Sequence, residues 1–96
     1  MRIAVTDGID KNAKLDLEEM GHQVEERHYS KEELLGGCIS DFDIIIIRSA
    51  TKITSDIIKA NRGEDSSLSM IIRAGVGIDN IDLTGATENS VLVCNT

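Results

Sequence analysis

Short apolar runs alternate with stretches that carry apolar side chains at helical spacing, about five times along the chain. The runs are typical of buried strands and the spaced stretches of amphipathic helices. The predicted strands cover residues 2–6, 22–29, 43–47, 70–72 and 91–94, and the predicted helices cover residues 11–20, 30–35, 54–61 and 82–88. Regular alternation of this kind predicts an α/β protein built on a parallel sheet.

The strongest strand signal is the run of four isoleucines that ends at Ile47. It is apolar on both faces, which indicates a central strand of a sheet that is covered on both sides. Residues 22–29 have Val24 as their only aliphatic side chain and indicate an edge strand. Ser30 and Glu33 have the spacing of a capping box, so a helix is expected to begin there.

The simplest arrangement of these elements is a flavodoxin-like, doubly wound sheet of five parallel strands in the order 2-1-3-4-5, with helices on both faces. Residues 1–96 are expected to form one domain, because 96 residues lie within the usual size range for a single core. The last predicted strand has no helix after it. We therefore expect either a truncated fold or a sheet face that is covered by something else.

Polar or flexible residues follow three strands that are neighbours in this order: Asp7-Gly8, Arg48-Ser49 and Gly75-Val76-Gly77. Ligands of such sheets bind outside the carboxyl ends of the strands. A guanidinium at position 48 could offer two parallel donors to a carboxylate or phosphate, and amides near Gly77 could add more. These features predict a pocket for a small acid, although Arg48 could equally be a surface arginine paired with Asp7 or Asp43.

Gly75 and Gly77 also resemble the start of the dinucleotide signature G-x-G-x-x-G, but the third glycine position is Asn80. The acidic residue that should follow about 20 positions later is also missing, because the sequence reaches Thr96 first. A nucleotide-binding site is therefore not predicted. Asp79 and Asn80 are instead expected to cap the next helix.

Composition excludes several other classes of function. The net charge is −7, there is one Tyr, one Phe and no Trp, and Lys and Arg do not cluster, so no nucleic-acid partner is expected. The longest aliphatic run is too short for a membrane span and no signal peptide is apparent, so we expect a cytoplasmic protein. Cys38 and Cys94 lack the spacing of a metal or redox site, and no metal is expected.

Two long motifs, RSATKIT from Arg48 and RAGVGIDNID from Arg73, together with the closing Asn95-Thr96, resemble the NAD-dependent D-2-hydroxyacid dehydrogenases, including the members that oxidise 3-phosphoglycerate. The resemblance extends over nearly the whole chain. It implies the first part of a flavodoxin-like substrate-binding domain. The nucleotide-binding domain, the catalytic residues and a covering C-terminal helix of such enzymes have no counterpart in these 96 residues.

Carried over by position, the resemblance implies that Arg48, Ser49 and Ala50 form the first substrate loop, with the guanidinium near the phosphate or carboxylate. Val76 and Gly77 would form the second loop, and Val76 would also approach the nicotinamide. No catalytic residue is expected in this chain. Asn80 and Asp82 are expected to cap a helix.

Two hypotheses remain open from the sequence. In the first, the chain is the substrate-binding portion of an NAD-dependent oxidoreductase that acts on a 2-hydroxy acid such as 3-phosphoglycerate, in serine biosynthesis. NAD would bind the full-length parent and not this chain alone, which would be inactive, and the partners would be the substrate, the missing nucleotide-binding domain and a second copy on the uncovered sheet face. In the second, the chain is a stand-alone, non-catalytic module that binds a small anion.

Overall fold

The computed structural model describes all residues except 10, 49, 64–65, 75–79 and 96. Its sheet has five strands: β1 (Arg2–Val5), β2 (Gln23–Glu26), β3 (Ile44–Ile47), β4 (Met70–Arg73) and β5 (Leu92–Asn95). All neighbouring pairs are parallel, and the order is β2-β1-β3-β4-β5. The predicted fold class and strand order are therefore confirmed.

The isoleucine strand lies at the centre of the sheet, as predicted. Ile45 and Ile47 are fully buried and belong to the main core, whereas Ile46 points to the opposite face with Ile3 and Val5. A run that is apolar at every position suits this place, because both of its faces are turned away from water. β2 is an edge strand, also as predicted, but it ends at Glu26 and leaves Tyr29 outside the sheet.

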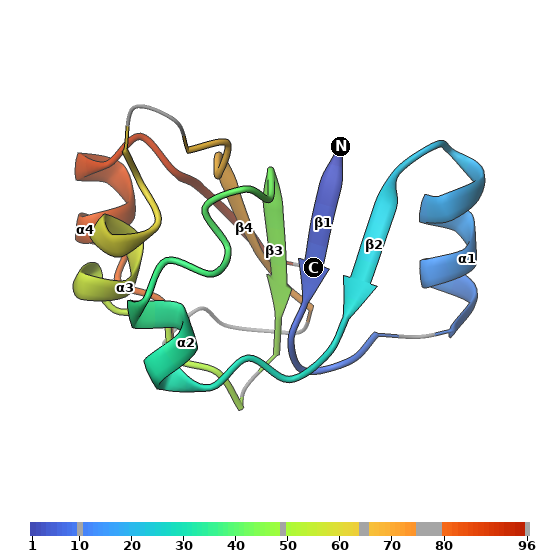
Figure 1. Ribbon diagram of the computed structural model, residues 1–96, viewed down its shortest axis with the longest axis horizontal. Coiled ribbons are helices and arrows are strands. Elements are labelled where there is room, and N and C mark those ends of the chain that lie inside the picture. Colours follow the sequence, from blue (N-terminus) through green and yellow to red (C-terminus); the bar gives the residue numbers. More distant parts are fainter. Residues whose placement is uncertain (10, 49, 64–65, 75–79, 96) are drawn as a thin grey trace.

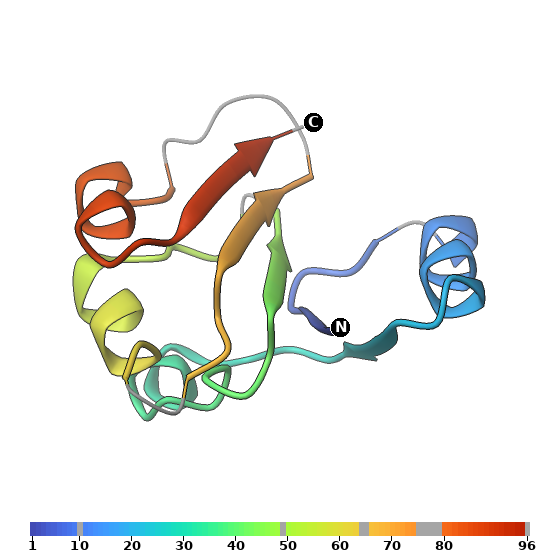
Figure 2. The ribbon, with the colours of Figure 1, turned by 90° about the horizontal axis from the view of Figure 1, so that it is seen from above.

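Three short helices cover one face of the sheet: α2 (Lys31–Leu35), α3 (Ser55–Ala60) and α4 (Leu83–Glu88). Helix α1 (Lys11–Glu19) lies on the other side, beyond β2 (Figures 1 and 2). The main core fills the space between the sheet and the three short helices. The second cluster, on the α1 side, has only three buried members, so the two faces are unequally covered.

Side-chain caps explain where the short helices begin. Ser30 and Glu33 form the predicted capping box at α2, and the Thr54 hydroxyl accepts a hydrogen bond from Ile57 N at the start of α3. At α4 the cap is Asp82, whose carboxylate accepts from Gly85 N at 2.9 Å. The expectation that Asn80 also caps this helix is wrong, because its side chain is used elsewhere.

The sheet face on the α1 side leaves apolar side chains uncovered near β4 and β5. Ile72 and Ile44 are only partly buried, and Leu92, which pairs with Met70 on the same face, is 56% exposed. Figure 2 shows α1 on the far side of β2, away from these two strands. Among the described residues, no helix lies over this part of the sheet, in agreement with the predicted incomplete cover.

We expect this chain to self-associate as its concentration rises, because contiguous exposed apolar surface favours association. Leu92→Lys should weaken that association about fivefold, since the aliphatic contact is lost and a charge takes its place. Sedimentation velocity across a concentration series measures the effect. Leu83→Lys is the matched control, because Leu83 is 45% exposed on α4, at the other face. Equal effects of the two changes, or a wild-type chain that stays monomeric throughout, would contradict the prediction.

Candidate functional site

Arg48 follows β3 directly, and its side chain is exposed at the carboxyl edge of the sheet. Its guanidinium makes no hydrogen bond or ion pair with any residue that the structure describes. The ion pair with Asp7 that the sequence left open is not formed. Asp7 instead accepts a hydrogen bond from the backbone N–H of Arg48, at 2.7 Å. Among the described residues, the charged end of Arg48 is therefore exposed and has no protein partner.

The predicted convergence of strand ends is confirmed for the residues that can be placed. Asp7 after β1 bonds to Arg48 after β3, and Asn80, which follows β4 in sequence, donates to the carbonyl oxygen of Arg48 at 2.8 Å. Ala50 lies in the same connection and is exposed. Ser49, Val76 and Gly77, the other predicted substrate-binding residues, lie outside the described residues. Nothing in the structure tests their roles.

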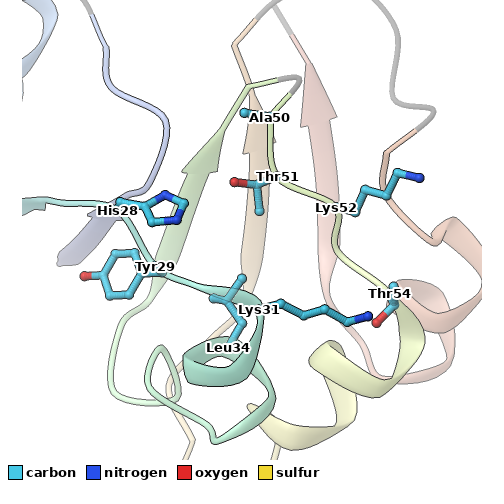
Figure 3. A pocket seen from close by; sticks show the side chains of 8 residues that line it. All are labelled: His28, Tyr29, Lys31, Leu34, Ala50, Thr51, Lys52 and Thr54. Atoms are coloured by element: carbon cyan, nitrogen blue, oxygen red, sulfur yellow. The ribbon is translucent and has the colours of Figure 1, made fainter.

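A cavity of about 340 Å³ adjoins the Arg48 connection on the side of the short helices. Two cationic residues, Lys31 and Lys52, line it together with the imidazole of His28 (Figure 3). The Lys31 ammonium extends toward the Thr54 hydroxyl in this view. The described residues that line it are His28, Tyr29, Lys31, Leu34, Ala50, Thr51, Lys52 and Thr54. Among these residues there are cations and hydroxyls and no carboxylate, a charge balance that favours an anion.

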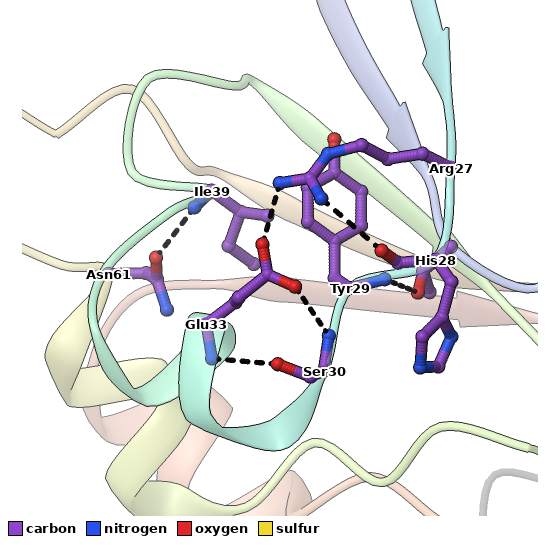
Figure 4. A network of polar contacts seen from close by, with 8 residues as sticks. Arg27, His28, Tyr29, Ser30, Glu33, Ile39 and Asn61 are labelled. Atoms are coloured by element: carbon purple, nitrogen blue, oxygen red, sulfur yellow. Dashed lines mark hydrogen bonds and ion pairs between the residues drawn. The ribbon is translucent and has the colours of Figure 1, made fainter.

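The segment between β2 and α2, which forms one wall of this cavity, is held by a polar network (Figure 4). The Arg27 guanidinium lies 4.1 Å above the Tyr29 ring and donates to the Glu33 carboxylate at 3.0 Å. The backbone N–H of Ser30 and the Arg27 side chain both donate to Glu33 and lower the pKa of that carboxyl group. Burial raises the pKa of Tyr29, whose backbone N–H donates to the buried Thr6 hydroxyl at 3.1 Å. These contacts fix the wall that carries His28 and Lys31.

A larger apolar groove of about 370 Å³ runs along the opposite face of the sheet. Its described lining residues are Ile9, Ala13, Leu17, Ile46, Arg48, Ile72 and Ala74. Arg48 thus lines this groove, and Ala50, two residues later, lines the cationic cavity.

The strand order already placed Asp7 beside Arg48, but the sequence reading paired it with the guanidinium and not with the backbone N–H. It missed Thr51 and Asn80 as partners in this site. The described residues contain no group of three or more His, Cys, Asp or Glu side chains that could hold a metal ion. Cys38 and Cys94 are free thiols and only partly buried. Within the same part of the chain, no helix has the length and apolar character needed to cross a membrane.

Fold and site together define an α/β domain with an exposed arginine at the carboxyl edge of a parallel sheet. The chain belongs to the D-isomer specific 2-hydroxyacid dehydrogenase family, whose catalytic domain matches residues 3–96. It is 42% identical over 95 residues to the D-3-phosphoglycerate dehydrogenase of Methanocaldococcus jannaschii, a match that covers 99% of this chain and 17% of that enzyme.

Two further relatives, one compared by sequence and one by structure, match nearly the whole of this chain. The chain is 41% identical over 98 residues to the hydroxypyruvate reductase of Thermotoga maritima, covering 99% of this chain and 30% of the reductase. The crystal structure of NAD⁺-bound 3-phosphoglycerate dehydrogenase from Entamoeba histolytica superimposes with a TM-score of 0.82 at 35% identity, over 100% of this chain and 32% of the other. The chain thus spans less than a third of the length of each of these relatives.

Proposed function

We propose that this chain is the substrate-binding part of an NAD-dependent oxidoreductase that acts on the CH–OH group of a 2-hydroxy acid, and that the acid is D-3-phosphoglycerate of serine biosynthesis. The observation that carries the proposal is the exposed guanidinium of Arg48, which has no partner among the described residues, at the carboxyl edge of the sheet in a chain that is 42% identical to a D-3-phosphoglycerate dehydrogenase. Oxidation of the alcohol requires a hydride acceptor, which NAD supplies when bound. We place the cofactor site and the catalytic residues outside these 96 residues, so the chain alone is inactive.

In this proposal Arg48 binds the carboxylate or the phosphate of the acid through paired charge-assisted donors. Ser49 and Ala50 form the rest of the first substrate loop. Val76 and Gly77 form the second, and Val76 also approaches the nicotinamide. The motif resemblance supports these last four assignments, and the exposed position of Arg48 supports the first.

The relatives leave two substrate classes to separate, a phosphorylated acid and the unphosphorylated hydroxypyruvate. The cationic cavity favours the first, because Lys31 and Lys52 line it next to Ala50. A phosphate carries about two negative charges near neutral pH, so a cavity beside the Lys31 ammonium stabilises it better than a hydroxyl group. We assign this cavity to the phosphate end of the substrate.

Lys31→Met is expected to raise the dissociation constant for D-3-phosphoglycerate about fivefold and to leave that for D-glycerate unchanged, because only the first ligand carries the phosphate. Titration of the ¹⁵N-labelled chain, followed by NMR, measures both constants. Lys14→Met is the matched control, since Lys14 lies on α1, on the other side of the molecule. An equal loss of affinity for D-3-phosphoglycerate and D-glycerate would show that the cavity does not bind the phosphate group.

The oxidoreductase itself is tested in a chimera in which this chain replaces the matching segment of the M. jannaschii enzyme. We expect NAD reduction with D-3-phosphoglycerate, and none from the 96-residue chain alone. A chimera that is folded and inactive, built on a chain that still binds the acid, would favour the non-catalytic anion-binding module. The gene sequence after the codon for Thr96 gives an independent answer, since a G-x-G-x-x-G motif in frame would support the dehydrogenase.

A further inference from the structure

The carboxylate of Asp7 holds two different groups of the connection that follows β3. Its Oδ2 accepts from the backbone N–H of Arg48 at 2.7 Å, and its Oδ1 accepts from the Thr51 hydroxyl, also at 2.7 Å. Thr51 is only 7% exposed, so its hydroxyl has little access to water as an alternative partner. Asp7 therefore joins both ends of segment 48–51 to the end of β1.

Asn80, in the connection that follows β4, holds the same segment from the other side. Its side-chain N–H₂ group donates to the carbonyl oxygens of Arg48 at 2.8 Å and of Thr51 at 2.5 Å. The opposite orientation of the amide would set its oxygen against two carbonyl oxygens, so the two acceptors dictate that the nitrogen faces them. A backbone pair strengthens this contact, because Ile53 N donates to Asn80 O at 2.8 Å.

Both backbone polar groups of Arg48 are thus bonded to side chains from other strand ends, while its own side chain is exposed. This is how a binding group is presented at low entropic cost, since the backbone that carries it is already ordered. A carboxylate near an anion site repels the ligand, so charge does not explain Asp7. We propose that Asp7 and Asn80 are positioning residues, which fix segment 48–51 so that Arg48 can bind the substrate anion. This inference rests on the proposed function.

Asp7 offers an isosteric pair of variants that separates geometry from charge. In Asp7→Asn the amide oxygen can accept from Arg48 N–H, and the amide nitrogen can donate to the Thr51 hydroxyl, which also accepts. Both contacts survive without the charge. Asp7→Ala removes both contacts. Asn80→Ala removes the donors on the other side without a change of net charge.

We expect Asp7→Ala and Asn80→Ala each to weaken binding of D-3-phosphoglycerate to the ¹⁵N-labelled chain about fivefold, and Asp7→Asn to restore it to within about twofold. Hydrogen exchange of the Arg48 amide should become faster in Asp7→Ala and stay slow in Asp7→Asn. Asn89→Ala is the control for a purely structural effect: Asn89 lies at the end of α4, where its side chain donates to Gly85 O, and its loss should change neither readout. If Asp7→Ala does not fold, Thr51→Val removes one of the two contacts in its place.

The outcomes are distinct. Unchanged affinity and unchanged Arg48 exchange in Asp7→Ala would overturn the inference, and so would an equal loss of affinity in Asn89→Ala. If the wild-type chain binds no D-3-phosphoglycerate, the proposed function fails for this chain. The comparison of Arg48 amide exchange between Asp7→Ala and Asp7→Asn then decides whether the carboxylate positions the segment.

Discussion

Replacing Asn61 with alanine is expected to lower the free energy of unfolding by about 3 kcal/mol. Asn61 is 0% exposed and lies at the end of α3. Its Oδ1 accepts from Ile39 N at 3.0 Å (Figure 4), and its Nδ2 donates to Leu34 O and to Ile57 O, both at 2.8 Å. One amide thus joins α2, the segment that follows it, and α3.

The expected cost comes mainly from Ile39. Its buried N–H has no other partner among the described residues, whereas Leu34 O still accepts from Gly37 N and Ile57 O still accepts from the backbone of residue 61. An orphaned buried donor costs about 1–3 kcal/mol, and the two lost bonds to carbonyl oxygens add about 1 kcal/mol each at most. For a domain of this size the loss corresponds to a melting temperature lower by about 15 °C.

Asn89 provides the matched control for this measurement. It occupies the same place at the end of α4, and its Nδ2 donates to Gly85 O, four residues back, at 2.8 Å. Asn89 is only partly buried and makes a single side-chain bond of this kind. Asn89→Ala should therefore cost about 1 kcal/mol. Urea unfolding of the wild type and of both variants measures the two losses. Similar losses in the two variants would show that the Asn61 contacts do not brace the helices as described.

Most of the fold could be predicted from the sequence because local signals and burial agree. The isoleucine strand is apolar at every position and lies at the centre, and the capping box of Ser30 and Glu33 begins a helix. Asn61 could not be recognised in this way. It is the last residue of the helix predicted over 54–61, directly before a polar connector, yet α2 and α3 pack so that its amide is enclosed. Burial of a polar residue depends on tertiary packing, which no local pattern encodes.

The candidate site was predictable in outline and not in its contacts. The strand order brings the residues after β1 and β3 together, so the meeting of Asp7 with Arg48 follows from topology. Whether the Asp7 carboxylate contacts the guanidinium or the backbone of Arg48 depends on the conformation of the connection after β3. The structure shows the contact with the backbone N–H. Asn80 was assigned to a helix cap because Asn is a good capping residue, but Asp82 is correctly placed for Gly85 and takes that role.

Arg48→Ala is expected to raise KM for D-3-phosphoglycerate about thirtyfold in the chimera and to leave kcat nearly unchanged. The guanidinium has no partner among the described residues, so its removal disturbs no contact that the structure describes, and we expect the loss to fall on binding of the anion. Arg48→Lys should give an intermediate KM, because the ammonium keeps the charge but lacks the two parallel donors of the fork. Steady-state rates over a substrate series measure both constants.

Arg2 is the matched control, since it starts β1 at the opposite edge of the sheet and its guanidinium stacks on the Phe42 ring at 4.6 Å. Arg2→Ala removes the same charge and should lower stability slightly without a change in KM. Rising salt should raise KM for the wild type more than for Arg48→Ala, because screening weakens only an interaction that exists. An unaltered KM in Arg48→Ala, or equal salt dependence in the two proteins, would show that Arg48 does not bind the substrate. The cavity lined by Lys31 and Lys52 would then be the remaining candidate for the anion site.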